Sequence, residues 1–289
     1  MNVMLTGAGG QLGRCLQERW PRQWRLHALA FADLDITNPQ AVDALVRRLK
    51  PDLIINAAAY NAVDKAEAQP AQAHAVNALG PFYLAQAAAA VSARLIHVST
   101  DYVFDGLAAR PYREEDDPAP LNAYGRSKRA GELAVLGSSA KAMVVRTAWV
   151  YSEYPGNFVT TMLRLAGLQD VVRVVDDQTG TPTYAGDLAQ AIIQLAGMGQ
   201  AGPTGLYHYA GATTVSRYDF AKRIYIAADA ADFAGRKARL EPLSSAQFNA
   251  AARRPGYSAL DCRKISALGL DVYGLEDRLG AVVQRILRA

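Results

Sequence analysis

The stretch "LNAYGRSKRAGE", residues 121–132, places a tyrosine and a lysine at a spacing suited to acid–base chemistry. Tyr124 and Lys128 are four residues apart, so on a helix their side chains lie on the same face. A phenol has an ordinary pKa near 10, and we expect the neighbouring ammonium group to lower it by about 1 to 3 pH units. The pair therefore predicts proton transfer near neutral pH.

Spacing alone does not identify the site, because Tyr218 and Lys222 repeat it. Only Tyr124 follows a predicted strand with a polar end, "HVSTDYVF" at residues 97–104. Ligands of open α/β folds bind at the carboxyl ends of strands, so we expect Thr100 to hold a substrate oxygen beside Tyr124. We interpret Tyr218 and Lys222 as an ordinary exposed helix face.

Alternating strand-like and helix-like segments must position these residues. Short β-branched runs alternate with Ala- and Leu-rich segments of helical period, and Asn38 before Pro39 is a typical helix start. Such alternation predicts an α/β fold of the Rossmann type, with a doubly wound parallel sheet covered by helices on both faces. The predicted strands are residues 2–7, 53–59, 94–100 and 143–151, and the predicted helices are residues 11–20, 38–50, 71–91 and 185–197.

A glycine-rich turn follows the first predicted strand. "LTGAGGQLGR" places Gly7, Gly10 and Gly13 three residues apart, directly before the first predicted helix. Glycines there permit a tight turn and close approach of the backbone to a pyrophosphate, which the helix N-terminus also favours. The N-terminal position within a βαβ series favours dinucleotide binding over a plain turn.

The choice of dinucleotide depends on the end of the second strand, where an acid usually binds the adenosine ribose of NAD. Here Ala30 is near that position, and the first acids come later, at Asp33 and Asp35. Arg14 is a candidate partner for a 2′-phosphate, with a solvated helix residue as the equal alternative. We predict NADPH and leave NADH open. Small side chains in "NAAAY", residues 56–60, would let the cofactor lie against the backbone, although tight helix packing explains them nearly as well.

Composition limits the other partners. The formal net charge is +4 and basic residues are scattered, which argues against a nucleic-acid-binding face and fits a small anionic substrate. No apolar run is long enough to span a membrane, and the N-terminus lacks the pattern of an export signal, so we expect no membrane contact and a cytoplasmic location. Cys15 and Cys262 are expected to be free thiols.

The motifs together resemble those of the extended short-chain dehydrogenase/reductase family, in a branch that reduces nucleotide-linked ketosugars. The resemblance covers nearly the whole chain, and the order of its motifs is more specific than any one of them. It implies residues 1–150 as an NAD(P)-binding domain and residues 151–289 as mainly a substrate-binding lobe, with segments near 171–210 returning to the sheet. The motifs are "GAGGQLGR", "PDLIINAAAYNAVDKAE", "VSTDYVFDG", "PLNAYGRSKRAGE", "VVRTAWVY", "NFVTTMLRLA", "DDQTGTPTYAGDLA" and "ARRPGYSALD".

This resemblance implies roles for individual residues. Tyr124 would be the proton donor, Lys128 would bind the cofactor ribose and tune the tyrosine, and Thr100 would contact the sugar. Paired guanidinium groups also suit a diphosphate. The plain alternative for Trp149 is an aromatic side chain of the core, and for Arg253 and Arg254 it is a surface ion pair. The implied cofactor contacts are Gly7, Gly10, Gln11, Leu12, Asp35, Ile36, Ala59, Tyr60, Asn61, Tyr124 and Lys128, and the implied substrate contacts are Thr100, Asp101, Trp149, Arg253 and Arg254.

The implied reaction is hydride transfer from NADPH to the C4 ketone of dTDP-4-dehydro-β-L-rhamnose, giving dTDP-L-rhamnose. Related dehydratases carry an acidic pair after the strand-end threonine, whereas Tyr102 follows Asp101 here, which favours reduction over an epimerase or dehydratase activity. The other alternative is a non-catalytic NADP-binding regulatory subunit of a methionine adenosyltransferase. The retained Thr100, Tyr124 and Lys128 argue against it.

Some family members form dimers bridged by magnesium, which carboxylates of the first and last helices bind. In this chain Cys15 occupies the first-helix position, and the final segment "VVQRILRA" contains no acid. The magnesium positions are therefore not matched, no metal ligand is predicted, and monomer and homodimer both remain open.

Overall fold

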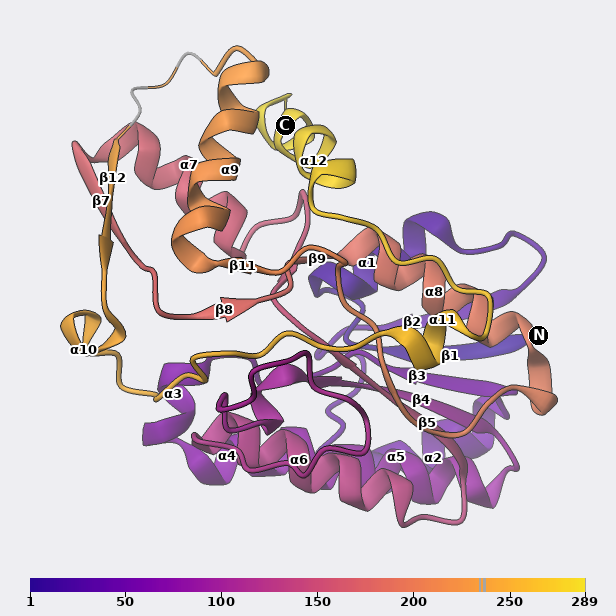
Figure 1. The fold of residues 1–289 in the computed structure, drawn as a ribbon. Helices are drawn as coiled ribbons and strands as arrows, with labels where there is room; N and C mark the ends of the chain where they lie inside the picture. Colours follow the sequence, from indigo (N-terminus) through magenta and orange to yellow (C-terminus); the bar gives the residue numbers. More distant parts are fainter. Residues whose placement is uncertain (234, 236–237, 289) are drawn as a thin grey trace.

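Parallel strands, all but one of them from residues 1–150, pair into one sheet (Figure 1). The computed structural model describes residues 1–233, 235 and 238–288. In spatial order the strands are β10 (Gly205–His208), β5 (Lys141–Thr147), β4 (Arg94–Thr100), β3 (Leu53–Asn56), β1 (Asn2–Thr6) and β2 (Arg25–Leu29). From β1 the chain adds β2 on one side and β3 on the other, and such a switch in direction creates a crevice at the carboxyl ends of the strands.

Apolar side chains cover both faces of this sheet because successive residues of a strand point to opposite sides. Val3 and Leu5 pack into one buried cluster, whereas Met4 between them packs into another. The first cluster includes helices α1 (Gln11–Arg19), α8 (Ala185–Gly197) and α11 (Arg263–Ser266), and the second includes α2 (Pro39–Leu49), α5 (Gly80–Ala90) and α6 (Ala123–Leu136). The prediction of a doubly wound α/β fold is confirmed.

Local signals in the sequence account for several element ends. The side chain of Asn38 accepts a hydrogen bond from the Ala41 amide at 3.0 Å and caps α2, as predicted. The segment predicted as one helix over residues 71–91 is continuous but contains a π-helical turn, η1. It comprises α4 (Pro70–His74), η1 (Ala75–Leu79) and α5, and the separate short helix α3 (Val63–Ala68) precedes it.

A second lobe packs beside the carboxyl edge of the sheet (Figure 1). Its core combines three helices with a two-stranded parallel sheet. The helices are α7 (Phe158–Leu168), α9 (Arg217–Ala230) and α12 (Glu276–Arg288), and the strands are β7 (Val171–Val175) and β12 (Arg239–Leu243). Short connecting elements are η2 (Asp101–Val103), β6 (Val150–Tyr151), β8 (Thr179–Gly180), β9 (Thr183–Tyr184), η3 (Gly199–Ala201), β11 (Val215–Ser216) and α10 (Ser245–Phe248).

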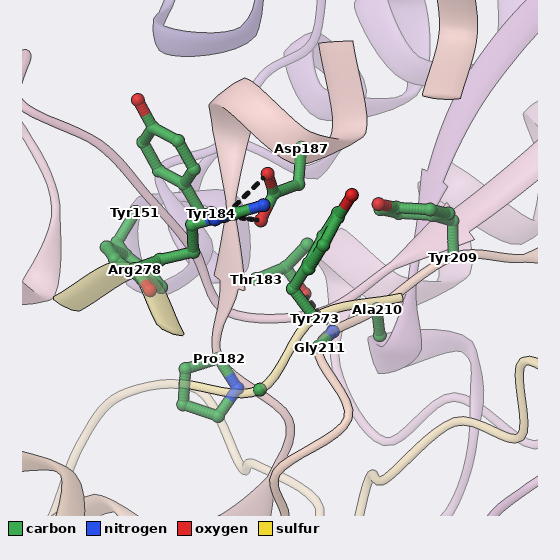
Figure 2. Close-up of a pocket in the computed structure, with 11 residues that line it drawn as sticks. Tyr151, Pro182, Thr183, Tyr184, Asp187, Tyr209, Ala210, Gly211, Tyr273 and Arg278 are labelled. Carbon is green, nitrogen blue, oxygen red and sulfur yellow. Dashed lines mark hydrogen bonds and ion pairs between the residues drawn. The ribbon is translucent and has the colours of Figure 1, made fainter. Parts of the chain in front are cut away.

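One contact between the lobes is an ion pair with tyrosine side chains around it (Figure 2). Arg278 of α12 donates from Nε to both carboxylate oxygens of Asp187 on α8, at 2.8 and 2.9 Å. The guanidinium group also lies 3.9 Å from the centroid of the Tyr273 ring. These contacts link the second lobe to a helix that covers the sheet.

The boundary near residue 150 stays a prediction. The chain crosses between the lobes more than once, because β10 extends the sheet and Ile265 packs in the sheet core. Within the described residues, no helix is both long and apolar enough to cross a membrane.

Candidate active site

A cleft of about 360 Å³ lies at the carboxyl edge of the sheet, between the two lobes. It brings together Thr100 from the end of β4, Tyr124 and Lys128 from α6, and Trp149 from the segment after β5. Residues separated by up to 49 positions in the chain thus share one surface, as the sequence predicted for them.

The start of α6 explains how Tyr124 reaches the cleft. The Asn122 side chain accepts a hydrogen bond from the Gly125 amide at 2.7 Å and fixes the helix N-terminus. A Cβ at Gly125 would lie 2.1 Å from the carbonyl oxygen of Tyr102, so only glycine lets α6 approach the segment after β4 this closely. The close approach places Tyr124 beside Thr100.

Burial dominates the acidity of Tyr124. Burial raises the pKa of its phenol, and the hydrogen bond with Thr100 opposes that rise only in part. The expected fall of this pKa beside Lys128 is wrong, because removing the phenol from water outweighs its hydrogen bond with Thr100. Tyr124 therefore keeps its proton near neutral pH.

Lys128 is also buried, with 2% of its surface exposed. Its Nζ donates a hydrogen bond to the carbonyl oxygen of Val98 at 2.7 Å. Burial lowers the pKa of this ammonium to about 8, although the negative charge of Glu132 works in the opposite direction. One of the three N–H donors is used by Val98, which leaves donors for a ligand in the cleft.

A buried ion pair connects α6 to β5. Glu132 accepts two hydrogen bonds from Arg146 of β5, each 2.7 Å long, and both side chains are fully buried. Ser99, which precedes Thr100, donates to the same carboxylate at 2.7 Å. Burial alone raises the pKa of Glu132, but the hydrogen bonds and charge of Arg146 outweigh it, so the pKa lies below its ordinary value.

Asp101 is a buried carboxylic acid that lines the cleft beside Thr100. Burial raises the pKa of its carboxyl group to about 6, against opposing hydrogen bonds with Ser258 and Thr100 and the charge of Arg217. Its Oδ1 accepts a hydrogen bond from the Thr100 hydroxyl at 3.1 Å. Thr100 and Asp101 thus form one polar end of the cleft.

The glycine turn has the geometry that a dinucleotide needs. Gly7 has a positive φ of 77°, and a Cβ there would lie 2.5 Å from the backbone of Ala57. A Cβ at Gly13 would lie 2.3 Å from the Gly7 oxygen. Gly10 precedes α1, which has no side-chain cap and no acidic residue in its first turn. The first-turn amides of α1 are therefore suited to bind a pyrophosphate.

Asn77 holds the loop after β3, where the cofactor was expected to lie. Its Oδ1 accepts from the Tyr60 amide at 2.8 Å, and its Nδ2 donates to the Ser127 hydroxyl at 2.9 Å. Asn77 is part of the π-helical turn η1, and such turns often occur at functional sites. The loop is thereby tied to α6, and Ala59 and Asn61 line the cleft.

Several expected cofactor residues lie outside this cleft. Gly7 shapes the turn, Ile36 packs in the core against Gly80, and the Asp35 carboxylate accepts hydrogen bonds from the amide and hydroxyl of Thr37. The Tyr60 hydroxyl donates to Gln69 at 2.7 Å. The residues expected at the cofactor that do line the cleft are Gly10, Gln11, Leu12, Ala59, Asn61, Tyr124 and Lys128.

The two arginines predicted to bind the diphosphate do not line the cleft. Arg254 forms a two-pronged ion pair with Asp64, at 2.6 and 3.2 Å, because the segment that carries it packs against α3. The backbone oxygen of Arg253 accepts a hydrogen bond from Asn122 at 2.8 Å. Ion pairing, the plain alternative for these residues, describes Arg254.

Arg217 lines the cleft and was missed by the sequence reasoning. It begins α9 in the second lobe, directly after the capping residue Ser216. Its guanidinium group lies 3.5 Å from the centroid of the Trp149 ring. No spacing rule connects positions 149 and 217, so the sequence contained no local signal for this contact.

Cys15 occupies the first-helix position at which some family members bind magnesium. Across residues 1–233, 235 and 238–288, no group of three or more His, Cys, Asp or Glu side chains is arranged to hold a metal ion. Burial raises the pKa of the Cys15 thiol to about 12, which keeps it protonated and a poor ligand. The surroundings of Cys15 therefore do not fit a bridging magnesium ion.

Comparisons with known proteins give a consistent result. The family model described as "RmlD substrate binding domain" matches residues 1–287. The chain is 47% identical to a dTDP-4-dehydrorhamnose reductase of Mycobacterium tuberculosis, over 93% of this chain and 87% of that protein. It is 44% identical to one of Aggregatibacter actinomycetemcomitans, over 91% of each. The crystal structure of dTDP-4-dehydrorhamnose reductase from Bacillus anthracis in complex with NADP is 37% identical, with a TM-score of 0.90 over 99% of this chain and 98% of that one.

Proposed function

Because the chain belongs to the dTDP-4-dehydrorhamnose reductase family, we propose that it reduces the C4 ketone of dTDP-4-dehydro-β-L-rhamnose to dTDP-L-rhamnose, with NADPH as reductant. One observation carries the proposal beyond family membership. Tyr124, Lys128 and Thr100 line the same cleft, next to the glycine turn that suits a dinucleotide.

Tyr124 is the proposed proton donor. A reductase needs its acid protonated when negative charge develops on the ketone oxygen, and the raised pKa of the buried phenol keeps it so. Thr100 is placed to hold the same oxygen through its hydroxyl, which already lies in hydrogen-bonding reach of Tyr124. The two hydroxyl groups together would orient the carbonyl and stabilise its developing charge.

Lys128 and α1 are proposed to position the cofactor. Bound NADPH supplies the hydride of the reaction. The free donors of Lys128 suit a ribose hydroxyl, and the uncapped first turn of α1 suits the pyrophosphate. A positive Lys128 would also stabilise the phenolate that Tyr124 becomes after donating its proton.

NADPH is proposed over NADH on the chemistry after β2. Asp33, the first acid there, accepts a hydrogen bond from the Ala30 amide, and Asp35 is engaged by Thr37. Each carboxylate thus already accepts a hydrogen bond within its own turn, whereas Arg14 is exposed near the glycine turn and donates to the Gly9 oxygen. Comparison of kcat/KM for NADPH and NADH, in the wild type and in Arg14→Ala, tests this preference.

The other readings find less support in the cleft. A dehydratase would need an acid where Tyr102 stands, and a purely regulatory subunit has no need of the intact Thr100, Tyr124 and Lys128 set. A cytoplasmic location, the lack of nucleic-acid partners and the choice between monomer and homodimer stay predictions.

An isotope experiment tests the proposal directly. The protein is incubated with enzymatically prepared dTDP-4-dehydrorhamnose and NADPH deuterated at the nicotinamide C4, and the product is analysed by NMR and mass spectrometry. We expect dTDP-L-rhamnose with deuterium at C4 of the sugar. No NADPH consumption, or deuterium at any other carbon, would exclude the proposed reduction.

A further inference from the structure

Arg217 is a cation that lines the cleft, with the buried Asp101 carboxyl group nearby. Within the described part of the chain its guanidinium group forms no ion pair with an Asp or Glu side chain. Burial lowers the pKa of this group, while the nearby Tyr102 and Asp101 favour its charged form. A partly buried cation without a direct ion pair favours a ligand that brings compensating negative charge.

Trp149 holds Arg217 in a defined place. The guanidinium plane stands 3.5 Å from the indole centroid and 5.2 Å from the Phe158 centroid. Trp149 itself has a positive φ of 45°, and a Cβ at Gly180 would lie 2.5 Å from its indole, so this packing requires glycine there. Stacking occupies the face of a guanidinium group and leaves its N–H edges for oxygens. A hydrogen bond with Tyr102 uses part of the five N–H donors, and the others remain for a ligand.

The helix that begins at Arg217 adds to the positive potential. α9 (Arg217–Ala230) is long enough to carry a positive N-terminal end, which Asp219 in its first turn offsets only in part because Asp219 also pairs with Lys222. Arg254 adds further positive charge, since it lowers the pKa of Arg217 by repulsion. Arg254 differs from Arg217 because Asp64 already neutralises it.

From these contacts we infer that Arg217 binds the diphosphate of the nucleotide sugar, with Trp149 as the platform that aims its N–H groups. The inference rests on the proposed function and assigns to the second lobe the anion contact that the sequence had placed at Arg253 and Arg254. A diphosphate offers oxygens for a two-pronged contact with a guanidinium fork. It would also compensate the unpaired charge at the start of α9.

Binding measurements with dTDP, dTMP and thymidine test the inference in the full-length protein. We expect Arg217→Gln to weaken dTDP binding about 10- to 100-fold, the effect of losing a charge-assisted contact. The loss should be smaller for dTMP and near zero for thymidine, because it follows the charge of the ligand. Arg217→Lys should restore part of the affinity, since it keeps the charge without the planar fork.

A matched control is available on the same helix. Lys222→Gln removes a cation of α9 that is 48% exposed, pairs with Asp219 and lies outside the cleft, and it should leave dTDP affinity unchanged. Melting temperatures report whether Arg217→Gln still folds. In turnover, Arg217→Gln should raise KM for the sugar nucleotide more than it lowers kcat, with NADPH affinity unaltered.

The outcomes separate this inference from the proposed function. Unchanged dTDP affinity in a folded Arg217→Gln, or an equal loss for thymidine, would overturn the role of Arg217. A wild-type protein that binds no dTDP would overturn it as well. If the wild type binds dTDP through Arg217 but does not reduce the ketosugar, the inference stands and the proposed reduction fails.

Discussion

Replacing Glu132 with glutamine removes the negative charge from the buried ion pair under the candidate active site. The carboxylate accepts two 2.7 Å hydrogen bonds from Arg146, one from Ser99 and one of 3.0 Å from Arg129, and Glu132 and Arg146 are fully buried. Glutamine keeps the volume but leaves the Arg146 charge without a counter-charge. Breaking a buried pair in this way costs about 3 to 5 kcal/mol.

The expected pH dependence follows from the direction of the pKa shift. The pKa of Glu132 is lower in the folded protein than in the unfolded chain, where it is about 4.3. Its stabilisation is therefore fully present above about pH 4.3 and is lost as the pH falls through the lower folded-state value. The difference between wild type and Glu132→Gln should shrink in that acidic range.

Urea denaturation of both proteins at neutral pH and under acidic conditions measures these quantities. Asp43→Asn is the matched control, because its ion pair with Arg47 is exposed and water screens it, so its loss should change stability little. The double variant Glu132→Leu with Arg146→Met should recover part of the loss, since no fully buried unpaired charge remains and the partly exposed Arg129 can turn to water. A loss in Glu132→Gln no larger than in Asp43→Asn would refute the reasoning.

Three further predictions concern the glycine turn, the cleft lysine and the first-helix thiol. Gly13→Ala should cost about 1 to 3 kcal/mol of folding free energy and weaken NADPH binding, because the new Cβ would meet the Gly7 oxygen. Gly9→Ala, with open space around it, should change neither the melting transition in calorimetry nor the NADPH affinity in calorimetric titrations. NADPH affinity should fall as the pH rises through about 8, where Lys128 of the free protein loses its charge, and fluorescence titrations of Lys128→Met should lack this dependence. The free energy of unfolding should rise over the same pH range, because the unfolded chain then binds more protons than the folded protein. Cys15 is fully buried with a pKa of about 12, so mass spectrometry should find it unmodified by iodoacetamide until the protein unfolds; labelling of the native protein would contradict its placement.

Local rules were sufficient for the parts of the site that one element or one turn determines. The i, i+4 spacing placed Tyr124 and Lys128 on one face of α6, and the alternation of elements placed Thr100 at the edge of a parallel sheet. The glycine spacing located a turn whose backbone contacts only glycine permits at Gly7 and Gly13. Each of these inferences uses short-range geometry that sequence patterns encode.

Properties that depend on burial or on contacts between the lobes were not available from the sequence. The pKa of Tyr124 was expected to fall, but burial of the phenol raises it. Arg254 was expected at the diphosphate, but it pairs with Asp64. Arg217 reaches Trp149 only through the folding of the second lobe onto the sheet edge. Desolvation and tertiary contact are collective properties of the fold, which pairwise spacing does not report.

The most direct test of the central claim compares Tyr124→Phe with Tyr218→Phe in reduction of dTDP-4-dehydrorhamnose, followed by loss of NADPH absorbance. Both tyrosines have a lysine four residues later, but only Tyr124 lines the cleft. We expect Tyr124→Phe to lower kcat about 10²- to 10⁴-fold, the effect of losing a general acid, and Tyr218→Phe to match the wild type. Undiminished turnover by a folded Tyr124→Phe would contradict the assignment of Tyr124 as the proton donor.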